Sequence, residues 1–440
     1  MIDLERLLEN AFRAAVAAAA PETCVPPHLP PAPRGRLLVV GAGKAAAAMA
    51  RAVELHYRDL PDERFEGVVV TRYGHAVPTE RITVLEAGHP VPDEAGVRAT
   101  ERIVALARSA ETGDLVLVLV SGGGSALLTA PEGVTASEKA ALTRALLASG
   151  ADIHAINLVR RHLSGVKGGA LAVAAHPAEV LTLAISDVVG DAPAVIASGP
   201  TVASDGTFAN ALGVLDRFDI EAPAARRALA DGRDGKRRGP PAPDDSRLAR
   251  ARYVLVADAQ TSLGAAAQAL RDGGVTAHVL ASEVTGEARE VGALHAAIAR
   301  QVARDGQPFA PPCAFLSGGE TTVTVRGEGR GGRNAEFALG VATGLVGPAA
   351  ERLPADMRFW LLAGDTDGID GTEDNAGALL GPRHLARLTL DAVRDALAAN
   401  DAYGLLDQVG GLLVTGPTRT NVNDLRIVVV APAPTASGQG

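Results

Sequence analysis

Leu115-Val-Leu-Val-Leu-Val120 is followed at once by Ser121-Gly-Gly-Gly-Ser125. Six aliphatic residues in a row are typical of a strand that is buried on both faces, as in a parallel sheet covered by helices. Three consecutive glycines cost backbone entropy, so we expect another group to approach this backbone too closely for a Cβ atom. Bare amides at the end of a buried strand would suit a phosphate or a carboxylate.

Two further glycine turns follow aliphatic runs in the same way. Gly41-Ala-Gly43-Lys44 comes after Leu37-Leu-Val-Val40, and Ser317-Gly-Gly-Glu320 comes after Ala314-Phe-Leu316. Three turns of this kind in one chain favour a ligand with several phosphates over a packing feature that occurred once.

Strands and helical patterns alternate along most of the 440 residues, which predicts an α/β protein. A chain of this length predicts two domains, and the charged, proline- and glycine-rich stretch 231–247 is the best linker candidate. We expect residues 1–240 to form a Rossmann-like doubly wound parallel sheet. A second β-α-β series then starts at Tyr253–Val256, and residues 250–435 form a mixed sheet in which 317–326 makes a hairpin.

Composition excludes several classes of function. The net charge of −9 gives no general attraction for nucleic acid or acidic lipid. No apolar run approaches the ~20 residues that span a bilayer. The two cysteines, Cys24 and Cys313, are far apart and offer neither zinc spacing nor a disulfide framework. We therefore expect a cytoplasmic protein without membrane or nucleic-acid partners.

Gly41-Ala-Gly43-Lys44-Ala-Ala46 matches the G-x-G-x-x-A dinucleotide pattern, and it follows a strand and opens a helix. The next strand ends in Thr71-Arg72, however, with no acid for a ribose hydroxyl. Lys44 also falls near a helix N-terminus, where a cation opposes the helix dipole unless it faces an anion. The alternative is a tight strand–helix turn with a solvated lysine.

Charged side chains cluster in four other places. Asn157–Gly169 carries Arg160 and Lys167, and a glycine-rich loop carries Arg333 to the start of a helix. Guanidinium groups on such a loop suit closure over a phosphate. Asp187 and Asp191 follow a strand, where a metal-binding or proton-accepting carboxylate is expected. Asp365 and Asp367 lie in a turn that suits magnesium or a hydroxyl, although a cluster of Asx turns would look the same.

Nine motifs in matching order resemble the glycerate 2-kinase family, the class with a C-terminal MOFRL domain, some of whose members were named hydroxypyruvate reductases. The motifs are the following: Gly41–Lys44, Gly88–Pro90, Ser121–Ser125, Arg161–Gly169, Ser186–Asp191, Ser317–Glu320, Gly331–Glu336, Asp365–Asp370 and Asn421–Asp424. The resemblance spans about residues 5–431. It implies ATP-dependent phosphorylation of D-glycerate at the 2-hydroxyl, with Mg²⁺, in a cleft between two α/β domains.

The resemblance also implies roles for particular residues. Lys44 and Arg333 fall on the family's lysine and arginine that matter for activity, and Asp187 falls on a carboxylate after a strand. Our hypothesis gives both cations to the transferring phosphate, Asp187, Asp191, Asp365 and Asp367 to the metal, and Arg160 or Lys167 to the glycerate carboxylate. The other candidate substrate- and nucleotide-binding residues are Gly41, Gly43, Ser121, Gly122, Gly123, Gly124, Ser125, Ser317, Gly318, Gly319, Glu320, Asn334 and Asn423.

Two other functions fit parts of the pattern. An NADPH-dependent hydroxypyruvate reductase is supported by the dinucleotide pattern and Arg72, but the chain lacks a clear His/Glu pair on the hydride side. A non-catalytic sugar-phosphate sensor would need the same anion-binding turns. The sequence does not choose between the 2- and the 3-hydroxyl of glycerate, and it does not give the oligomeric state.

Overall fold

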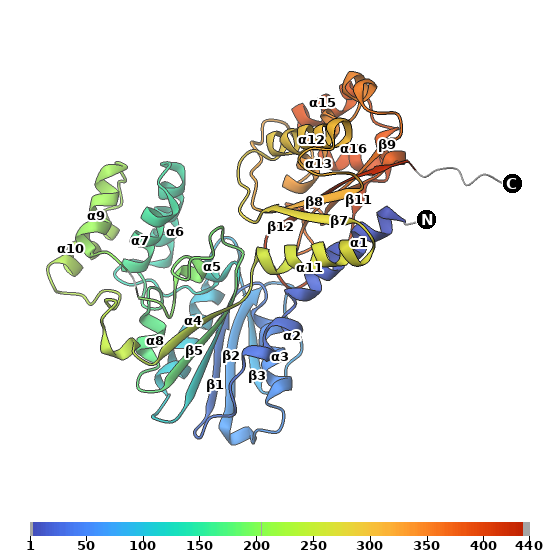
Figure 1. Cartoon of the computed structure of the whole chain (residues 1–440). Coiled ribbons are helices and arrows are strands. Elements are labelled where there is room, and N and C mark those ends of the chain that lie inside the picture. Colours follow the sequence, from blue (N-terminus) through green and yellow to red (C-terminus); the bar gives the residue numbers. More distant parts are fainter. Residues whose placement is uncertain (1–2, 204, 434–440) are drawn as a thin grey trace. The chain divides into compact units, whose positions relative to one another are not determined.

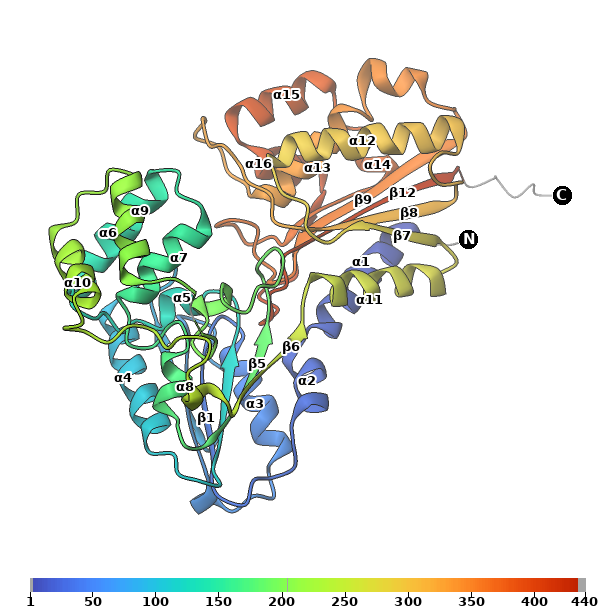
Figure 2. The same cartoon turned by 60° about the vertical axis from the view of Figure 1, so that its left-hand side comes forward.

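The computed structural model describes residues 3–203 and 205–433, which divide into two compact units (Figures 1 and 2). Residues 21–256 form one of them, called here the N-terminal unit. The other, called the C-terminal unit, combines the chain from Ala257 onward with the segment that ends at Ala20. Each unit is built around its own six-stranded sheet.

The sheet of the N-terminal unit consists of six parallel strands in the order β3-β2-β1-β4-β5-β6. Its strands are β1 (Leu37–Ala42), β2 (Phe65–Arg72), β3 (Ile82–Ala87), β4 (Leu115–Val120), β5 (Glu179–Ile185) and β6 (Ala251–Ala257). The strand order reverses between β1 and β4, which pair in register from Leu37 with Leu115 to Ala42 with Val120. In open α/β sheets, ligands bind at the carboxyl ends of the strands at such a reversal. The first two glycine turns follow these two strands.

Helices cover both faces of this sheet, as Figure 1 shows. The helices of the unit are α2 (Pro21–Cys24), α3 (Ala46–His56), α4 (Glu94–Arg108), α5 (Gly124–Leu127), α6 (Ala136–Ala148), α7 (Ile153–His162), α8 (Ala170–Ala174), α9 (Phe208–Arg217) and α10 (Pro223–Arg233). Val116, Val118 and Val120 of β4 pack in one apolar cluster with residues of α4 and α8. Because β4 is buried on both faces, its sequence shows a continuous apolar run and no alternation.

Four of these helices pack on one another in a cluster of their own. Leu142 and Leu146 of α6, Val159 of α7, Leu215 of α9 and Leu229 of α10 are buried in it. We call α6, α7, α9 and α10 the helical subdomain. It places α6 and α7 beside the segment that follows β4, so residues from both line one pocket.

The sheet of the C-terminal unit is mixed, as predicted, with the order β11-β10-β9-β12-β8-β7. Its strands are β7 (Thr276–Ala281), β8 (Cys313–Gly319), β9 (Met357–Asp365), β10 (Gly377–Leu380), β11 (Leu412–Leu413) and β12 (Asp424–Pro432). Central β12 runs antiparallel to both β8 and β9, whereas β7 and β8 are parallel. This register places Asp424 opposite both Gly319 and Asp365, so one end of three strands gathers polar residues.

Helices lie on both faces of the second sheet as well. They are α1 (Leu4–Ala18), α11 (Ala259–Asp272), α12 (Ala288–Asp305), α13 (Arg333–Thr343), α14 (Pro382–Leu385), α15 (Leu390–Ala399) and α16 (Ala402–Val409). Helices α12, α13, α15 and α16 share one apolar cluster with the sheet, and α1 and α11 share another. Helix α1 is amphipathic, and its apolar side is buried against the C-terminal unit.

Three expectations differ from the structure. Tyr253–Val256 lies in β6, which is the last strand of the first sheet and does not begin the second. The predicted hairpin at 317–326 is wrong, because Thr322 pairs with Glu287 in a single bridge and β8 instead pairs with β7 and β12. Domain limits of 1–240 and 250–435 also differ from the observed grouping, since α1 joins the C-terminal unit and the N-terminal unit continues to Val256.

No helix in the described part of the chain is both long enough and apolar enough to cross a membrane. Both cysteines, Cys24 and Cys313, are buried, and neither forms a disulfide in the described part of the chain.

Replacing Phe12 by alanine tests the docking of α1. Phe12 is only 2% exposed and lies in one cluster with Leu362 and Trp360. We expect Phe12→Ala to lower the free energy of unfolding of the C-terminal unit by about 3–5 kcal/mol. Trp360 is the only tryptophan of the chain, so its fluorescence during urea unfolding reports on this unit. Leu55→Ala, at a position that is 56% exposed, should change the value by less than about 0.5 kcal/mol. Equal effects of the two substitutions would contradict the docking.

Candidate functional site

The turns after β1 and β4 are hydrogen-bonded to each other. The amide of Lys44 donates to the carbonyl of Gly122 at 2.8 Å, and the amide of Ala45 donates to Ser121 Oγ at 3.0 Å. In return, the amide of Ser121 donates to the carbonyl of Ala42 at 3.2 Å. Helix α3 begins only at Ala46, so Lys44 lies in the turn and not in the first helical turn. The two strand ends therefore form one rigid unit.

Two of the glycines in these turns are required by the packing of the turns themselves. A Cβ atom on Gly41 would lie 2.3 Å from the carbonyl oxygen of Leu119, and one on Gly43 would lie 2.1 Å from Ser121 Oγ. Gly43 also has a φ of 145°, which L side chains rarely adopt. For these two positions the structure favours the tight-turn interpretation over direct contact with a ligand.

The glycines that follow β4 are crowded by functional side chains. A Cβ on Gly122 would lie 1.9 Å from Asp187 Oδ2. A Cβ on Gly123 would lie 2.9 Å from the ring of His89 and 3.5 Å from Lys44 Cγ. The missing side chains thus let a carboxylate, an imidazole and a lysine gather around one turn. We call Lys44, His89, Asp187 and residues 121–125 the glycine-turn site.

Backbone amides at the glycine-turn site are available to a ligand. Gly123 has a φ of 78° and caps the short helix α5. Within residues 3–203 and 205–433, neither the amide of Gly122 nor that of Gly123 donates a hydrogen bond to a backbone carbonyl. Successive amides in a left-handed turn form a concave site for anions. The third residue of the run, Gly124, donates to the carbonyl of Ser121 and is part of the turn itself.

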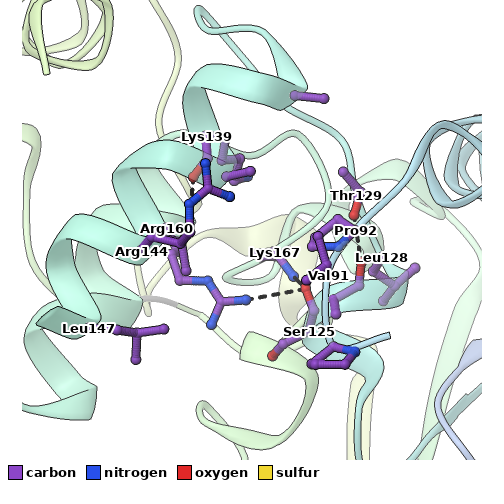
Figure 3. A pocket seen from close by; sticks show the side chains of 15 residues that line it. Val91, Pro92, Ser125, Leu128, Thr129, Lys139, Arg144, Leu147, Arg160 and Lys167 are labelled. Atoms are coloured by element: carbon purple, nitrogen blue, oxygen red, sulfur yellow. Dashed lines mark hydrogen bonds between the residues drawn. The ribbon is translucent and has the colours of Figure 1, made fainter. Parts of the chain in front are cut away.

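A pocket of about 240 Å³ opens next to Ser125 (Figure 3). Its walls come from residues 90–92, from the segment after β4, and from α6 and α7 of the helical subdomain. Arg160 and Lys167, both predicted from the sequence, converge on the carbonyl oxygen of Ser125 at 3.3 Å and 2.8 Å. Lys139 and Arg144 of α6 add two more cations. Among the described residues that line the pocket, none is an Asp or a Glu. We call this the cationic pocket.

Burial and mutual repulsion act together on these cations. Lys167 is 1% exposed, and burial followed by the charge of Arg160 holds the pKa of its ammonium well below the usual value. Burial and then Arg160 lower the pKa of Lys139 to about 7. Burial also lowers the pKa of Arg160. An anion in the pocket would relieve all three effects, because it replaces lost hydration with a counter-charge.

In the C-terminal unit, three carboxylates hold Arg333 at the end of the sheet where Asp424 pairs with Gly319 and Asp365. Its Nε donates to Asp424 Oδ1 at 2.9 Å, and its terminal nitrogens donate to Asp365 Oδ2 at 2.8 Å and to Glu320 Oε1 at 2.6 Å. Burial opposes the charge of Arg333, but Asp424 and Asp365 outweigh it and hold the pKa of the guanidinium above its ordinary value. Glu320 is the most exposed of the three partners, with 48% of its side chain accessible.

Asp424 has two further partners. Asn334 Nδ2 donates to Asp424 Oδ1 at 2.8 Å, and the fully buried Arg426 donates to Asp424 Oδ2 at 2.5 Å. Asp370 accepts hydrogen bonds from the amides of Asn334 and Ala335 and so caps the N-terminus of α13. Burial raises the pKa of Asp370 to about 6. The capped helix and the contacts of Asp424 with Asn334 and Arg426 fix the position of Arg333.

The turn 365–370 is a series of Asx turns. The amide of Asp367 donates to Asp365 Oδ1 at 3.0 Å, and the amide of Ile369 donates to Asp367 Oδ1 at 2.9 Å. Burial, followed by repulsion from Asp367, raises the pKa of Asp365 well above its usual value. These contacts give both carboxylates a structural role. In the described part of the chain, no group of three or more His, Cys, Asp or Glu side chains is arranged to hold a metal ion.

The sequence predicts a turn at the third glycine-rich segment, but residues 317–319 lie inside β8 and pair with β12. The neighbours of this strand end explain its glycines. A Cβ on Gly319 would lie 2.3 Å from the backbone nitrogen of Val284, and the amide of Val284 donates to the carbonyl of Gly318. Ser317 is buried, with its Oγ 2.9 Å from His295 Nε2. Burial lowers the pKa of His295 to about 4, so this imidazole is neutral. Asn423 contributes its backbone, because its carbonyl accepts a hydrogen bond from the amide of Thr366.

Several site residues were not found from the sequence. His89 belongs to a motif that carried the family resemblance, but it had no assigned role. Lys139 could have been found, because it occupies the buried stripe of α6 with Leu142 and Leu146, where a charged residue is unexpected. Arg426 stands inside an aliphatic strand, which is a similar signal.

The crowding at Gly122 generates a prediction about stability. Gly122→Ala would force Asp187 or the turn to move, and we expect a loss of about 1–3 kcal/mol in the free energy of unfolding of the N-terminal unit. Urea unfolding followed by circular dichroism measures it. Gly213→Ala is the control: nothing lies within 4 Å of its Cβ position in α9, so it should be neutral or stabilise by up to about 1 kcal/mol. Equal stability of the two variants would show that the turn is loosely packed.

Comparisons with known proteins agree with this architecture. Residues 7–230 match the family described as "Domain of unknown function (DUF4147)", and residues 313–424 match the "MOFRL family". A D-glycerate 2-kinase of Thermotoga maritima is 38% identical over 434 residues, which cover 97% of this chain and 98% of the relative. An Agrobacterium vitis protein whose name proposes a hydroxypyruvate reductase is 47% identical over 435 residues, 98% of this chain and 95% of the relative.

A solved structure shows the same fold. The crystal structure of glycerate kinase from Thermotoga maritima superposes with a TM-score of 0.86 at 37% identity, covering 97% of this chain and 99% of the other. Both sheets and both matched domains thus lie within one known architecture. The chain belongs to the glycerate 2-kinase family, the class with a C-terminal MOFRL domain.

Proposed function

We propose that this protein transfers a phosphoryl group from ATP to the 2-hydroxyl of D-glycerate. The observation that carries the proposal is the meeting of two anion sites at residues 121–125. The amides of Gly122 and Gly123 and the side chain of Lys44 suit a phosphate, whereas Arg160 and Lys167 converge on Ser125, three residues away from Gly122. In this proposal, the donor phosphate and the acceptor acid would bind next to each other on one rigid segment.

The size of the cationic pocket supports a small acceptor. Its volume of about 240 Å³ corresponds to about eight water molecules at roughly 30 Å³ each. D-Glycerate has a similar size, and its carboxylate would supply the counter-charge that Arg160 and Lys167 lack. Val91, Leu128 and Leu147 form the apolar part of the wall, which suits the carbon chain.

On the donor side, the chemistry is positioning and charge neutralisation, as in other phosphoryl transfers. Lys44 lies at the glycine-turn site and would neutralise the transferring phosphate. Magnesium is commonly held by one or two carboxylates together with substrate phosphates, so the single carboxylate of Asp187 beside Gly122 fits a metal ligand. Bound there, the ion would neutralise phosphate charge. Asp191, Asp365 and Asp367 remain predictions as ligands, and the last two already have structural contacts.

Arg333 remains the second cation predicted from the sequence. In the structure it is surrounded by acids, so a phosphate would have to compete with a carboxylate for it. Glu320 is the partner whose place a ligand could take, since Asp365 and Asp424 are buried while Glu320 is exposed. The expectation that both domains share one cleft also stays a prediction.

The reductase is the second candidate, because a close relative carries that name. The geometry gives it less support. The space beside the glycines of the dinucleotide pattern, Gly41 and Gly43, is occupied by Leu119 and Ser121. This turn therefore packs against the protein itself and leaves no room there for a dinucleotide. Strand β2 ends at Arg72 without an acid for a ribose hydroxyl.

Product analysis tests the proposed function. With ATP, Mg²⁺ and D-glycerate, we expect the ³¹P NMR spectrum to show 2-phosphoglycerate and ADP. A 3-phosphoglycerate signal would keep the kinase and change the hydroxyl. In a parallel assay with hydroxypyruvate and NADPH, we expect no enzymatic loss of absorbance at 340 nm. Oxidation of NADPH without phosphorylation of glycerate would overturn the proposal in favour of the reductase.

Lys44→Ala tests the role of the lysine at the glycine-turn site. Removing one charge that stabilises the transition state typically lowers kcat by about 10²–10³, and we expect a loss of that size with a small change in KM. Lys236→Ala is the matched control, because this lysine is exposed and forms a surface ion pair with Asp231 at 3.3 Å. Circular dichroism should show both variants folded. A Lys44→Ala variant as active as the control would remove Lys44 from the mechanism.

A further inference from the structure

The cationic pocket places four basic side chains around one cavity. Lys139 and Arg144 come from α6, Arg160 from α7, and Lys167 from the loop between α7 and α8. Among residues 3–203 and 205–433, each of the two lysines has one acceptor: Lys139 Nζ donates to the carbonyl of Leu163 at 2.7 Å, and Lys167 Nζ donates to that of Ser125 at 2.8 Å. A charged ammonium has three donors, so these single bonds do not replace its hydration.

The charged groups facing the two lysines do not neutralise them. Glu132, before α6, is the acid that acts on Lys139, and it also lies 3.4 Å from Arg237. The other neighbours are cations. From the surrounding elements, Arg160 of α7, Glu132 and Arg237 after α10 act on Lys139, whereas Arg160, Lys139 and Arg161 act on Lys167. Buried like charges of this kind favour the neutral amine when no anion is present.

We propose that binding of an organic acid anion in this pocket is coupled to proton uptake. The Lys139/Lys167 pair takes up one proton from solvent as the anion binds. The carboxylate supplies the counter-charge that makes a second ammonium stable among Arg160 and Arg144. In this step, one neutral amine nitrogen of the pair accepts a proton from solvent and becomes an ammonium as the carboxylate binds. The two lysines share one site, so the proton belongs to the pair and not to either residue alone.

The sign of the effect follows from linkage. In the empty pocket the pKa of Lys139 lies near 7 and that of Lys167 well below 10.5. A bound carboxylate raises both values, so binding draws in a proton at any pH between the empty and the occupied values. The affinity for the anion should then fall by up to about tenfold for each pH unit above 7. Arginine cannot lose its proton in this range, so an arginine in place of each lysine should remove the dependence.

Calorimetric titration with D-glycerate alone, without ATP, tests the inference on the whole protein. D-Glycerate carries no group that titrates near pH 8, so measurements in buffers with different ionisation enthalpies give the protons taken up per ligand. At pH 8 we expect close to one proton for the native protein, less for Lys139→Arg and for Lys167→Arg, and none for the double variant. Lys236→Arg, at an exposed site, should behave like the native protein.

Three results would overturn the inference: binding by the native protein without proton uptake, full uptake that persists in a folded double variant, or no binding of D-glycerate even at pH 6. Binding without proton uptake is measured on the native protein, so the inference can be tested even if an arginine variant misfolds. The inference takes its probe ligand from the proposed function. The two fail separately, because phosphorylation of D-glycerate without proton uptake leaves the kinase intact.

Discussion

The hydrogen bonds that join the ends of β1 and β4 are the constraint on which the N-terminal unit depends. Two neighbouring parallel strands end at the same edge, and the lysine turn of one donates its amides to the glycine turn of the other. This leaves no room for a Cβ on Gly41 or Gly43. The turns cannot move independently, so Lys44, Asp187 and the amides of residues 122–123 keep a fixed geometry. Preorganised donors of this kind need no reorganisation when charge develops on a ligand.

The two units treat buried positive charge in opposite ways. In the C-terminal unit, Arg333 and Arg426 share Asp424, and further acids complete the network. In the N-terminal unit, the cationic pocket has no carboxylate among its described lining residues. A buried charge with its own counter-ion is fixed in place, whereas one without a counter-ion can accept a ligand. The first arrangement positions a residue, and the second leaves a site for an anion.

Much of the architecture could be predicted from local sequence. The continuous apolar run before three glycines specifies β4 and its turn. Strand β3 is not predicted by the sequence analysis. It is an edge strand with several half-buried residues, so its apolar and polar residues do not alternate with a clear period of two. The sequence also could not show which sheet β6 joins, since strand pairing depends on contacts between distant residues. Thr322–Arg326 has an alternating pattern, but Thr322 and Thr324 bond to Gly286 and Glu287 and not to a hairpin partner.

The candidate site could be predicted in part. Positions after strands suggested Lys44 and Asp187, and the charged cluster at 157–169 suggested Arg160 and Lys167; the roles of all four remain predictions. The sequence could not show that Arg333 is held by three acids, because Glu320, Asp365 and Asp424 come from separate segments. The reason for each glycine was also hidden. A side chain is missing at Gly319 because the backbone of Val284 lies against it, and at Gly122 because Asp187 does.

Helix α1 packs against α11 and β9, although more than 200 residues separate it from either element along the chain. At a synthesis rate of about 5–20 residues per second, roughly half a minute passes between the synthesis of α1 and that of its packing partners Trp360 and Leu362. The N-terminal unit has all of its strands up to Val256 by then and can fold first. Helix α1 is therefore translated before the N-terminal unit but reaches its native packing after that unit can fold. In the nascent chain, the amphipathic helix α1 is therefore without its native partners for most of synthesis. Docking of α1 on the sheet of the C-terminal unit is a late step of folding.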